Sequence, residues 1–458
     1  MGKSVSAEIG RRIGSAKVHT APEILTCYAY DATNLRCLPD AVVLAETVED
    51  IQATATLCAQ AGVPVIPRGA GTGFAGGTVP SRGGVVVSTE RLNHILSIDR
   101  ERAEAVVEPG VVNAALQTEA GKVGLMFPPD PSSLEVCTLG GNVAQDAGGP
   151  RALKYGVTRD YVLGVDGVAY GGRAIDSPCP PTGAGWDPIT TLMVGSEGTL
   201  GIFTGIRLRL KPRPDRFATA LAFLKTTRDA AEAVNLIFDR GVLPAAVELV
   251  DRECLDSIAS FARVGLPAGA GCSLLVETDG AGDEARETMG LVEAALRGVS
   301  PIEVKIAASD RERENLWRMR RSVSPSLARI APWKINEDVC VPRSRLPLLV
   351  DGVARLAAKY GLKVPTFGHA GDGNLHVNVM FDRRSSNQVA RAGALADELF
   401  EVTLGLEGTI SGEHGIGLTK MKHLRGQLGD DLFRVEQRIK RAFDPGSLLN
   451  PGKVMGPA

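Results

Sequence analysis

Imidazole and carboxylate side chains gather in two glycine-rich stretches in the last quarter of the sequence. Four of the six histidines lie between residues 369 and 423. His369 and His376 are seven residues apart in GHAGDGNLHVN, where the Gly-Asp-Gly break can bend the chain and bring both rings together. The stretch GEHGIG then adds Glu413 and His414. Two imidazoles and one carboxylate make a sensible ligand set for a divalent cation, with positions left open for a substrate.

The adjacent pair in GEHGIG indicates a division of roles. Glu413 and His414 cannot share one face of a strand, so one side chain can face an ion while the other faces a substrate. On these residues alone, the cluster also fits a non-haem iron oxygenase or a metal-dependent hydrolase.

A separate glycine-rich stretch, PRGAGTGFAGGT, follows the apolar run VPVIP. Gly71, Gly73 and Gly76 fit the GxGxxG pattern of dinucleotide-binding folds. Those folds need a long helix directly after the loop, whereas here the strand-like run GVVVST begins almost at once. The stretch is therefore expected to surround a phosphate with backbone N–H groups, or else to be a glycine-rich connection between strands.

Two more stretches of small residues, TLGGNVA and GSEGTLG, lie in the same half of the sequence and indicate close approach of backbone to a large ligand. Together, PRGAGTG, TLGGNVA and GSEGTLGI resemble the flavoproteins of the vanillyl-alcohol oxidase type. Within them the match is to the branch of the glycolate oxidase FAD subunit, D-lactate dehydrogenase and D-2-hydroxyglutarate dehydrogenase. The resemblance covers nearly the whole chain. It disfavours both the oxygenase and the hydrolase, as does the lack of a GxSxG nucleophile motif.

The resemblance implies that FAD is the cofactor, with its pyrophosphate on the first glycine loop. Some relatives attach FAD through a histidine of that loop, but this sequence has Thr72 there and no histidine between residues 20 and 93. We therefore expect non-covalent FAD. The residues implied as FAD contacts are Pro67, Arg68, Gly69, Ala70, Gly71, Thr72, Gly73, Pro129, Ser132, Gly141, Asn142, Gly201, Ile202 and Asn450.

The resemblance also implies roles for the side chains of the cluster. The implied ligands of Zn²⁺, Mn²⁺ or Fe²⁺ are His369, His376 and Glu413. His414 is the implied catalytic base. The stretch LWRMRRSVS resembles the family's helix with an anion-binding arginine, which corresponds to Arg320. Lys334 fits a further cation that contacts the substrate.

Apolar periodicity predicts the elements that position these residues. Between 41 and about 212, short strand-like runs alternate with turns, and helices are predicted in VEDIQATATLCAQAG and VNAALQTEAGKVG. Between 217 and about 405, strands alternate with longer helices, and a charged helix is predicted over 418–443. The pattern predicts an α+β protein.

The domains expected from this pattern and the resemblance are four. They are a helical lead-in (1–34), a two-subdomain PCMH-type FAD-binding domain (35–214), a ferredoxin-like α+β substrate or cap domain (215–405) and a C-terminal segment that returns to the flavin (406–458).

The composition limits location and partners. The 458 residues are 44% hydrophobic, and the net charge of −2 disfavours a nucleic-acid binder. No apolar run approaches the roughly 18 residues of a membrane span, and the first residues lack the apolar segment of a secretory signal. The eight scattered cysteines lack the spacing of a zinc or iron–sulfur site and fit reduced thiols of a cytoplasmic protein.

The expected activity is FAD-dependent oxidation of a small D-2-hydroxy acid, glycolate or D-lactate, with hydride transfer to flavin N5. Electrons are expected to pass to a separate acceptor, such as an iron–sulfur subunit or an electron-transferring flavoprotein. The alternatives are a D-2-hydroxyglutarate dehydrogenase, an oxidase that forms H₂O₂, and a flavin subunit inactive without its partner. A homodimer and attachment to a membrane through a partner are both compatible with the sequence.

Overall fold

The computed structural model describes residues 2–177, 187–262 and 265–456, and the chain forms two compact units. Unit 1 combines the stretch up to Gly148 with residues 157–213 and 413–458, and unit 2 combines residues 149–156 with 214–412. The C-terminal stretch therefore belongs to the same unit as the amino-terminal half. The sequence did not indicate that residues 149–156 separate from their neighbours.

A small sheet in unit 1 carries the first glycine loop. Its strand order is β1-β2-β4-β3, and β2, β4 and β3 run parallel. The predicted helix after β2 is confirmed as α3 (Val48–Ala61), which begins at a Thr47 capping box and ends at Gly62 in the left-handed conformation. The bounds of the strands and of the flanking helices are α1 (Gly2–Ile13), β1 (Val18–His19), α2 (Pro22–Cys27), β2 (Ala41–Leu44), β3 (Val65–Arg68) and β4 (Val85–Ser88).

A second, antiparallel sheet of unit 1 has the order β5-β6-β10-β8-β9, and β7 and β11 form a separate antiparallel pair. Its buried side chains form one core with those of α4 and α5, and Ile439 and Phe443 of the C-terminal helix α15 pack against that core. The bounds are β5 (Ile95–Asp99), β6 (Glu104–Val107), α4 (Asn113–Lys122), β7 (Leu125–Met126), α5 (Leu139–Gln145), β8 (Val162–Val168), β9 (Ala174–Asp176), α7 (Pro188–Met193), β10 (Ile202–Arg209), β11 (Lys211–Pro212) and α15 (Met421–Phe443).

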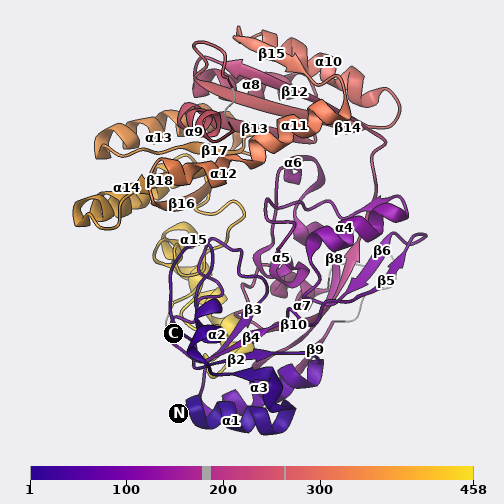
Figure 1. Ribbon diagram of the computed structural model, residues 1–458, viewed down its shortest axis with the longest axis vertical. Coiled ribbons are helices and arrows are strands. Elements are labelled where there is room, and N and C mark those ends of the chain that lie inside the picture. The colour runs from indigo at the N-terminus through magenta and orange to yellow at the C-terminus, as the bar shows by residue number, and fades with distance from the viewer. Residues whose placement is uncertain (1, 178–186, 263–264, 457–458) are drawn as a thin grey trace. The chain divides into compact units, whose positions relative to one another are not determined.

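Unit 2 is built on a seven-stranded sheet in which every neighbouring pair is antiparallel (Figure 1). The strands, in spatial order, are β15 (Glu303–Ile306), β12 (Arg216–Leu224), β14 (Cys272–Gly280), β13 (Ala246–Asp251), β17 (Thr366–His369), β18 (Asn374–Phe381) and β16 (Trp333–Cys340). The helices are α6 (Ala152–Tyr155), α8 (Thr227–Asp239), α9 (Arg252–Ala262), α10 (Glu284–Arg297), α11 (Asp310–Arg321), α12 (Val323–Ser326), α13 (Leu346–Tyr360) and α14 (Ser386–Gly405).

One face of the seven-stranded sheet packs against α9, α11 and α12. Leu255, Trp317 and Val323 of these helices share a core with sheet residues that include Val250 and Phe367. Because side chains alternate along a strand, residues two positions away from those sheet residues face the same side. Glu248 and His369, two positions from Val250 and Phe367, therefore lie on this face.

Among the described residues, no helix combines the length and the apolar character needed to cross a bilayer.

Candidate active site

The first glycine loop of unit 1 begins where β3 ends, at Arg68. The Arg68 guanidinium is buried, and its Nη1 donates to the Tyr30 carbonyl (2.8 Å) and to Thr78 Oγ1 (3.1 Å). Burial lowers the pKa of this guanidinium. Gly71, with φ +70°, lies directly over it, and a Cβ at Gly71 would overlap it, whereas Gly73 has open space beside it. The buried Arg68 side chain therefore packs beneath the glycine loop and supports its conformation.

The second stretch of small residues starts a helix rather than forming the loop expected from its glycines. Thr138 caps α5, since its Oγ1 accepts from Gly141 N (3.3 Å). A Cβ at Gly69 would overlap Thr138 Oγ1, and a Cβ at Gly198 of the third stretch would lie 3.1 Å from Pro67. All three stretches therefore adjoin one another within unit 1.

Unused polar atoms lie along these stretches. The carboxamide oxygen of Asn142 and the hydroxyl of Ser196 are buried and have no hydrogen-bond partner within the described part of the chain. Native proteins pair nearly all of their buried polar atoms, so unpaired ones indicate a bound group. In these stretches several glycines leave no room for a side chain, and buried polar atoms lack partners. Both features suit a binding site for a large polar cofactor such as FAD.

Other predicted cofactor contacts have structural roles in unit 1. The Pro129 carbonyl accepts from Asn113 Nδ2 (3.2 Å), and Ser132 is exposed. A Cβ at Gly201 would meet Met193 and the backbone of β8, and the Ile202 side chain is buried in a core. Only the backbone of Gly201 and Ile202 is therefore suited to contact a ligand.

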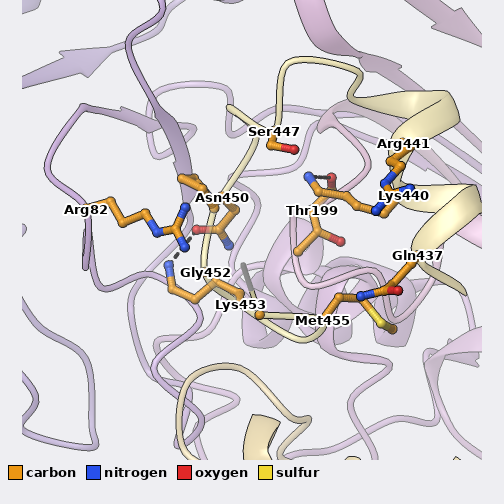
Figure 2. Close-up of a pocket in the computed structure, with 12 residues that line it drawn as sticks. Arg82, Thr199, Gln437, Lys440, Arg441, Ser447, Asn450, Gly452, Lys453 and Met455 are labelled. Atoms are coloured by element: carbon orange, nitrogen blue, oxygen red, sulfur yellow. Dashed lines mark hydrogen bonds between the residues drawn. The ribbon is translucent and has the colours of Figure 1, made fainter. Parts of the chain in front are cut away.

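Asn450 ties the C-terminal stretch to two of the glycine stretches. Its Nδ2 donates to the carbonyls of Gly77 and Glu197, both at 2.8 Å, and its Oδ1 accepts from Lys453 Nζ (2.7 Å). Figure 2 shows the Lys453 side chain directed at this carboxamide, and burial lowers the pKa of Lys453 to about 8. Because every polar atom of the Asn450 side chain is used in these contacts, the side chain holds the loops in position.

The loop that carries His414 is fixed within unit 1. The His414 ring stacks on Phe74, with 5.0 Å between ring centroids. The buried carboxylate of Glu197 accepts from the backbone N–H groups of Ile416 (2.7 Å) and Gly417 (2.8 Å). Burial raises the pKa of Glu197 to about 7, although the two hydrogen bonds act to lower that pKa.

In unit 2, a hairpin formed by β17 and β18 brings His369 and His376 together. His376 pairs across the hairpin with Phe367, and the two imidazole rings lie edge to face with centroids 5.2 Å apart. The turn between the strands is the Gly-Asp-Gly segment, and Gly373 needs its φ of +82° there. Both imidazoles are buried on the sheet face that packs against α11.

A buried glutamate on the neighbouring strand β13 links this hairpin to Arg320. Glu248 is the cross-strand partner of His369, and its Oε1 lies 2.6 Å from His369 Nδ1. Its Oε2 lies 2.5 Å from Nη2 of Arg320, which is on α11. The Arg320 guanidinium also lies over the Phe367 ring, 4.8 Å from its centroid. One carboxylate thus contacts both a predicted metal ligand and the predicted anion-binding arginine.

Lys334 adds a second, partly buried cation on the same face of the sheet. It pairs with Met380, which packs in the core beneath α11 and α12, and its Nζ donates to Ser324 Oγ of α12 (3.0 Å). Burial lowers the pKa of Lys334.

Glu413 immediately follows Gly412, the last residue of unit 2. Gly412 N donates to Asp338 Oδ2 on β16 (2.8 Å), and the site has no room for a Cβ, which would overlap the Asn374 amide. One ligand atom each from His369, His376 and Glu413 lie within 4.8 Å of one another. Two nitrogen donors and a carboxylate at this spacing fit a divalent cation.

Comparisons with known proteins identify the family. Residues 39–177 match the family described as the FAD binding domain, and residues 213–454 match the C-terminal domain of FAD linked oxidases. The chain belongs to the FAD-linked oxidase family.

Curated relatives align with nearly the whole of this chain. Glycolate oxidase subunit GlcD of Bacillus subtilis is 40% identical over 93% of this chain and 91% of its own length. The D-lactate dehydrogenase of Anaerostipes hadrus is 32% identical, over 97% and 96%. The D-2-hydroxyglutarate dehydrogenase of Xanthomonas citri is 33% identical, over 96% and 95%.

Solved structures agree on the fold of this FAD-linked oxidase. p-Cresol methylhydroxylase superposes with a TM-score of 0.83 at 18% identity, covering 99% of this chain and 97% of the other. The 4-ethylphenol oxidase from Gulosibacter chungangensis has a TM-score of 0.79 at 18% identity, covering 99% and 97%. The expected PCMH-type FAD-binding fold is confirmed.

The roles of two residues of this oxidase, Glu248 and Glu197, were not predicted from the sequence. Glu248 lies in the apolar strand AAVELV, and only its cross-strand pairing with His369 reveals its position. Glu197 lies in a glycine stretch, where its side chain gave no indication of the loop that it holds. A lone acidic residue inside an apolar strand was the available signal for Glu248, because a buried carboxylate needs a partner.

Proposed function

We propose that the protein oxidises a small D-2-hydroxy acid, glycolate or D-lactate, to the corresponding 2-oxo acid with FAD as the electron acceptor. The observation that carries this proposal is the set of buried polar side chains on one face of the unit 2 sheet. There, the rings of His369 and His376 lie edge to face, and Glu248 contacts both His369 and Arg320. The names of the curated relatives support the substrate class.

Arg320 is suited to hold the carboxylate of the substrate. A guanidinium binds a carboxylate through two parallel hydrogen bonds. The Arg320 Nε is buried and donates no hydrogen bond within the described part of the chain, so it has capacity for a further acceptor. Lys334, beside Ser324, supplies a second positive charge. D-2-hydroxyglutarate, which carries a second carboxylate, is therefore the runner-up substrate.

His369, His376 and Glu413 are the proposed ligands of a divalent cation, Zn²⁺, Mn²⁺ or Fe²⁺. A bound cation of this kind lowers the pKa of a hydroxyl that it contacts. A ring nitrogen of His414 takes the proton of the substrate hydroxyl. Phe74 and the Glu197 contacts hold the loop of this base in place.

FAD bound in this protein would supply the acceptor for the C2 hydride, whose loss turns the 2-hydroxy acid into the 2-oxo acid. The three adjoining glycine stretches of unit 1 are the proposed binding site. We propose that the electrons then pass to a separate acceptor, an iron–sulfur subunit or an electron-transferring flavoprotein. Relatives named as a subunit of glycolate oxidase support a partner. The cysteines of the described residues are free thiols, which supports a cytoplasmic location.

Purified protein loaded with FAD and a divalent cation tests this proposal. Glycolate, D-lactate, D-2-hydroxyglutarate and L-lactate are supplied with an artificial electron acceptor, under air and without air. Dye reduction by a D-acid or glycolate, and not by L-lactate, supports the proposal. Peroxide formed under air without dye identifies an oxidase. Dye reduction only after a partner subunit is added identifies a dependent flavin subunit, and no reduction by any 2-hydroxy acid with that partner contradicts the proposal.

A further inference from the structure

We propose that Glu248 is a positioning residue that sets the tautomer of His369 and the placement of Arg320 at the same time. The inference rests on the proposed function, because it deepens the roles given there to His369 and Arg320. Glu248 touches neither substrate nor cofactor in this account and acts through the two side chains that it holds.

Glu248 is built into the sheet at a point where it can serve both neighbours. It lies in the middle of β13, is fully buried, and stands directly opposite His369 on β17. A buried carboxylate is strongly unfavourable unless charged or hydrogen-bonding groups compensate it. Here the compensation comes from His369 Nδ1 at 2.6 Å on one oxygen and from the Arg320 guanidinium at 2.5 Å on the other.

The contact with His369 determines which ring nitrogen carries the proton. A carboxylate only accepts hydrogen bonds, so the neutral imidazole must carry its proton on Nδ1 to donate to Glu248. The lone pair is then on Nε2, the nitrogen left to bind a cation. Metal-binding histidines are commonly oriented by a carboxylate in this way, and the loss of such a partner typically lowers metal affinity about 10–100-fold.

The contact with Arg320 acts on the substrate side of the site. Arg320 is on α11, whose preceding turns are anchored by another carboxylate of the sheet. Glu277 accepts from Arg313 Nε (2.7 Å) and from Trp317 Nε1 (2.6 Å), seven and three residues before Arg320. The helix is therefore held independently, and Glu248 with the Phe367 ring orients the guanidinium itself.

Only a carboxylate can accept from both His369 and Arg320, and Glu248→Gln tests whether both contacts are needed. Glutamine offers one acceptor and one donor, whereas His369 Nδ1–H and the Arg320 guanidinium are both donors. If the amide nitrogen faces His369, the imidazole must move its proton to Nε2, which blocks the cation. If the amide oxygen faces His369, the amide nitrogen opposes the guanidinium, and substrate binding is impaired instead.

The experiment compares Glu248→Gln with a matched control, Asp279→Asn. Asp279 is another buried carboxylate of the same sheet, and it pairs with Lys154 and Tyr155. Three quantities are measured on protein with bound FAD: affinity for Zn²⁺ and Mn²⁺ by competition with a chelator, the tautomer of His369 by ¹⁵N NMR, and KM and kcat for the best 2-hydroxy acid.

The inference predicts an Nδ1–H tautomer for His369 in the parent. Glu248→Gln should either weaken Zn²⁺ and Mn²⁺ binding about 10–100-fold with an Nε2–H tautomer, or keep the metal and raise KM at least 10-fold. Asp279→Asn should change neither the metal affinity nor KM. An Nε2–H tautomer in the metal-free parent overturns the inference, and this measurement needs no variant to fold. Parental metal affinity, KM and tautomer in Glu248→Gln also overturn it.

A parent protein that binds neither cation contradicts the metal part of the proposed function rather than this inference. In that case, the parent's tautomer and the KM of Glu248→Gln still decide the role of Glu248.

Discussion

Replacing Glu197 by glutamine should change how the stability of the protein depends on pH. Both oxygens of Glu197 accept backbone hydrogen bonds from the loop that carries His414, and the side chain is buried. Burial is the larger influence, and it raises the pKa of this carboxyl from 4.5 to about 7. The protonated carboxyl is therefore favoured in the folded state.

The sign and size of the effect follow from linkage between proton binding and folding. Because the folded pKa lies above the unfolded one, the stability contribution is fully present below about pH 4.5 and is lost as the pH rises through about 7. A shift of roughly 2.5 pKa units corresponds to about 3 kcal/mol. Glutamine does not ionise. As the pH rises from 4.5 to 8, the free energy of unfolding of Glu197→Gln should therefore increase by about this much relative to that of the parent.

Thermal unfolding of FAD-loaded parent and variant across this pH range measures the effect. For units of about 150–250 residues, 1 kcal/mol moves Tm by about 2–4 °C, so the difference in Tm should change by about 6–12 °C. Any hydrogen bond lost to the amide adds an offset that is the same at every pH. Glu101→Gln, at an exposed turn, should follow the parent throughout. A Tm difference for Glu197→Gln that stays constant with pH would refute the reasoning.

Three further predictions concern the cofactor and the base. Gly71→Val should lower FAD occupancy at least about 10-fold, because a side chain at φ +70° is strained and overlaps the Arg68 guanidinium; the ratio of flavin to protein absorbance measures it, and normal occupancy would contradict it. Denaturation should release free FAD, because Thr72 cannot form a histidyl bond; flavin that stays with the precipitated polypeptide would contradict this. His414→Ala should slow flavin reduction about 10²–10⁴-fold while metal and FAD remain bound, whereas Glu413→Ala should lose metal and activity together. Stopped-flow reduction with metal analysis separates these two roles, and a parental rate in His414→Ala would exclude it as the base.

Local signals in the sequence were sufficient for several parts of the structure. Apolar spacing and the terminal glycine predicted α3, which ends at Gly62, and the structure adds a capping box at Thr47. The Gly-Asp-Gly break predicted a bend between the two histidines, and the structure has a hairpin turn there with their rings 5.2 Å apart. The absence of a crossover helix after the first glycine loop correctly excluded a dinucleotide-binding fold of the Rossmann type.

Contacts between distant parts of the chain were not predictable in this way. Glu248 and His369 are 121 residues apart, and only the strand order brings them together. Residues 149–156 lie between elements of unit 1, yet Lys154 and Tyr155 bind Asp279 of β14 in unit 2. Such pairings depend on tertiary topology, which apolar periodicity does not encode.

The same limit applies to residues that were assigned from motifs. Asn450 was predicted to contact FAD, but its carboxamide is fully used in joining backbone segments of unit 1. A motif gives the identity of a residue and not the direction of its side chain, so a positioning role and a ligand contact look alike in sequence.

Anaerobic mixing of the FAD-loaded protein with single 2-hydroxy acids tests directly whether the protein oxidises this class of substrate. The absorbance of the oxidised flavin is followed, and the 2-oxo acid formed is measured after one turnover. Glycolate or D-lactate should bleach the flavin and yield one 2-oxo acid per FAD, whereas L-lactate should leave the flavin oxidised. A flavin that stays oxidised with every D-2-hydroxy acid tried, in metal-loaded protein with full FAD occupancy, would show that the protein does not oxidise this class of substrate.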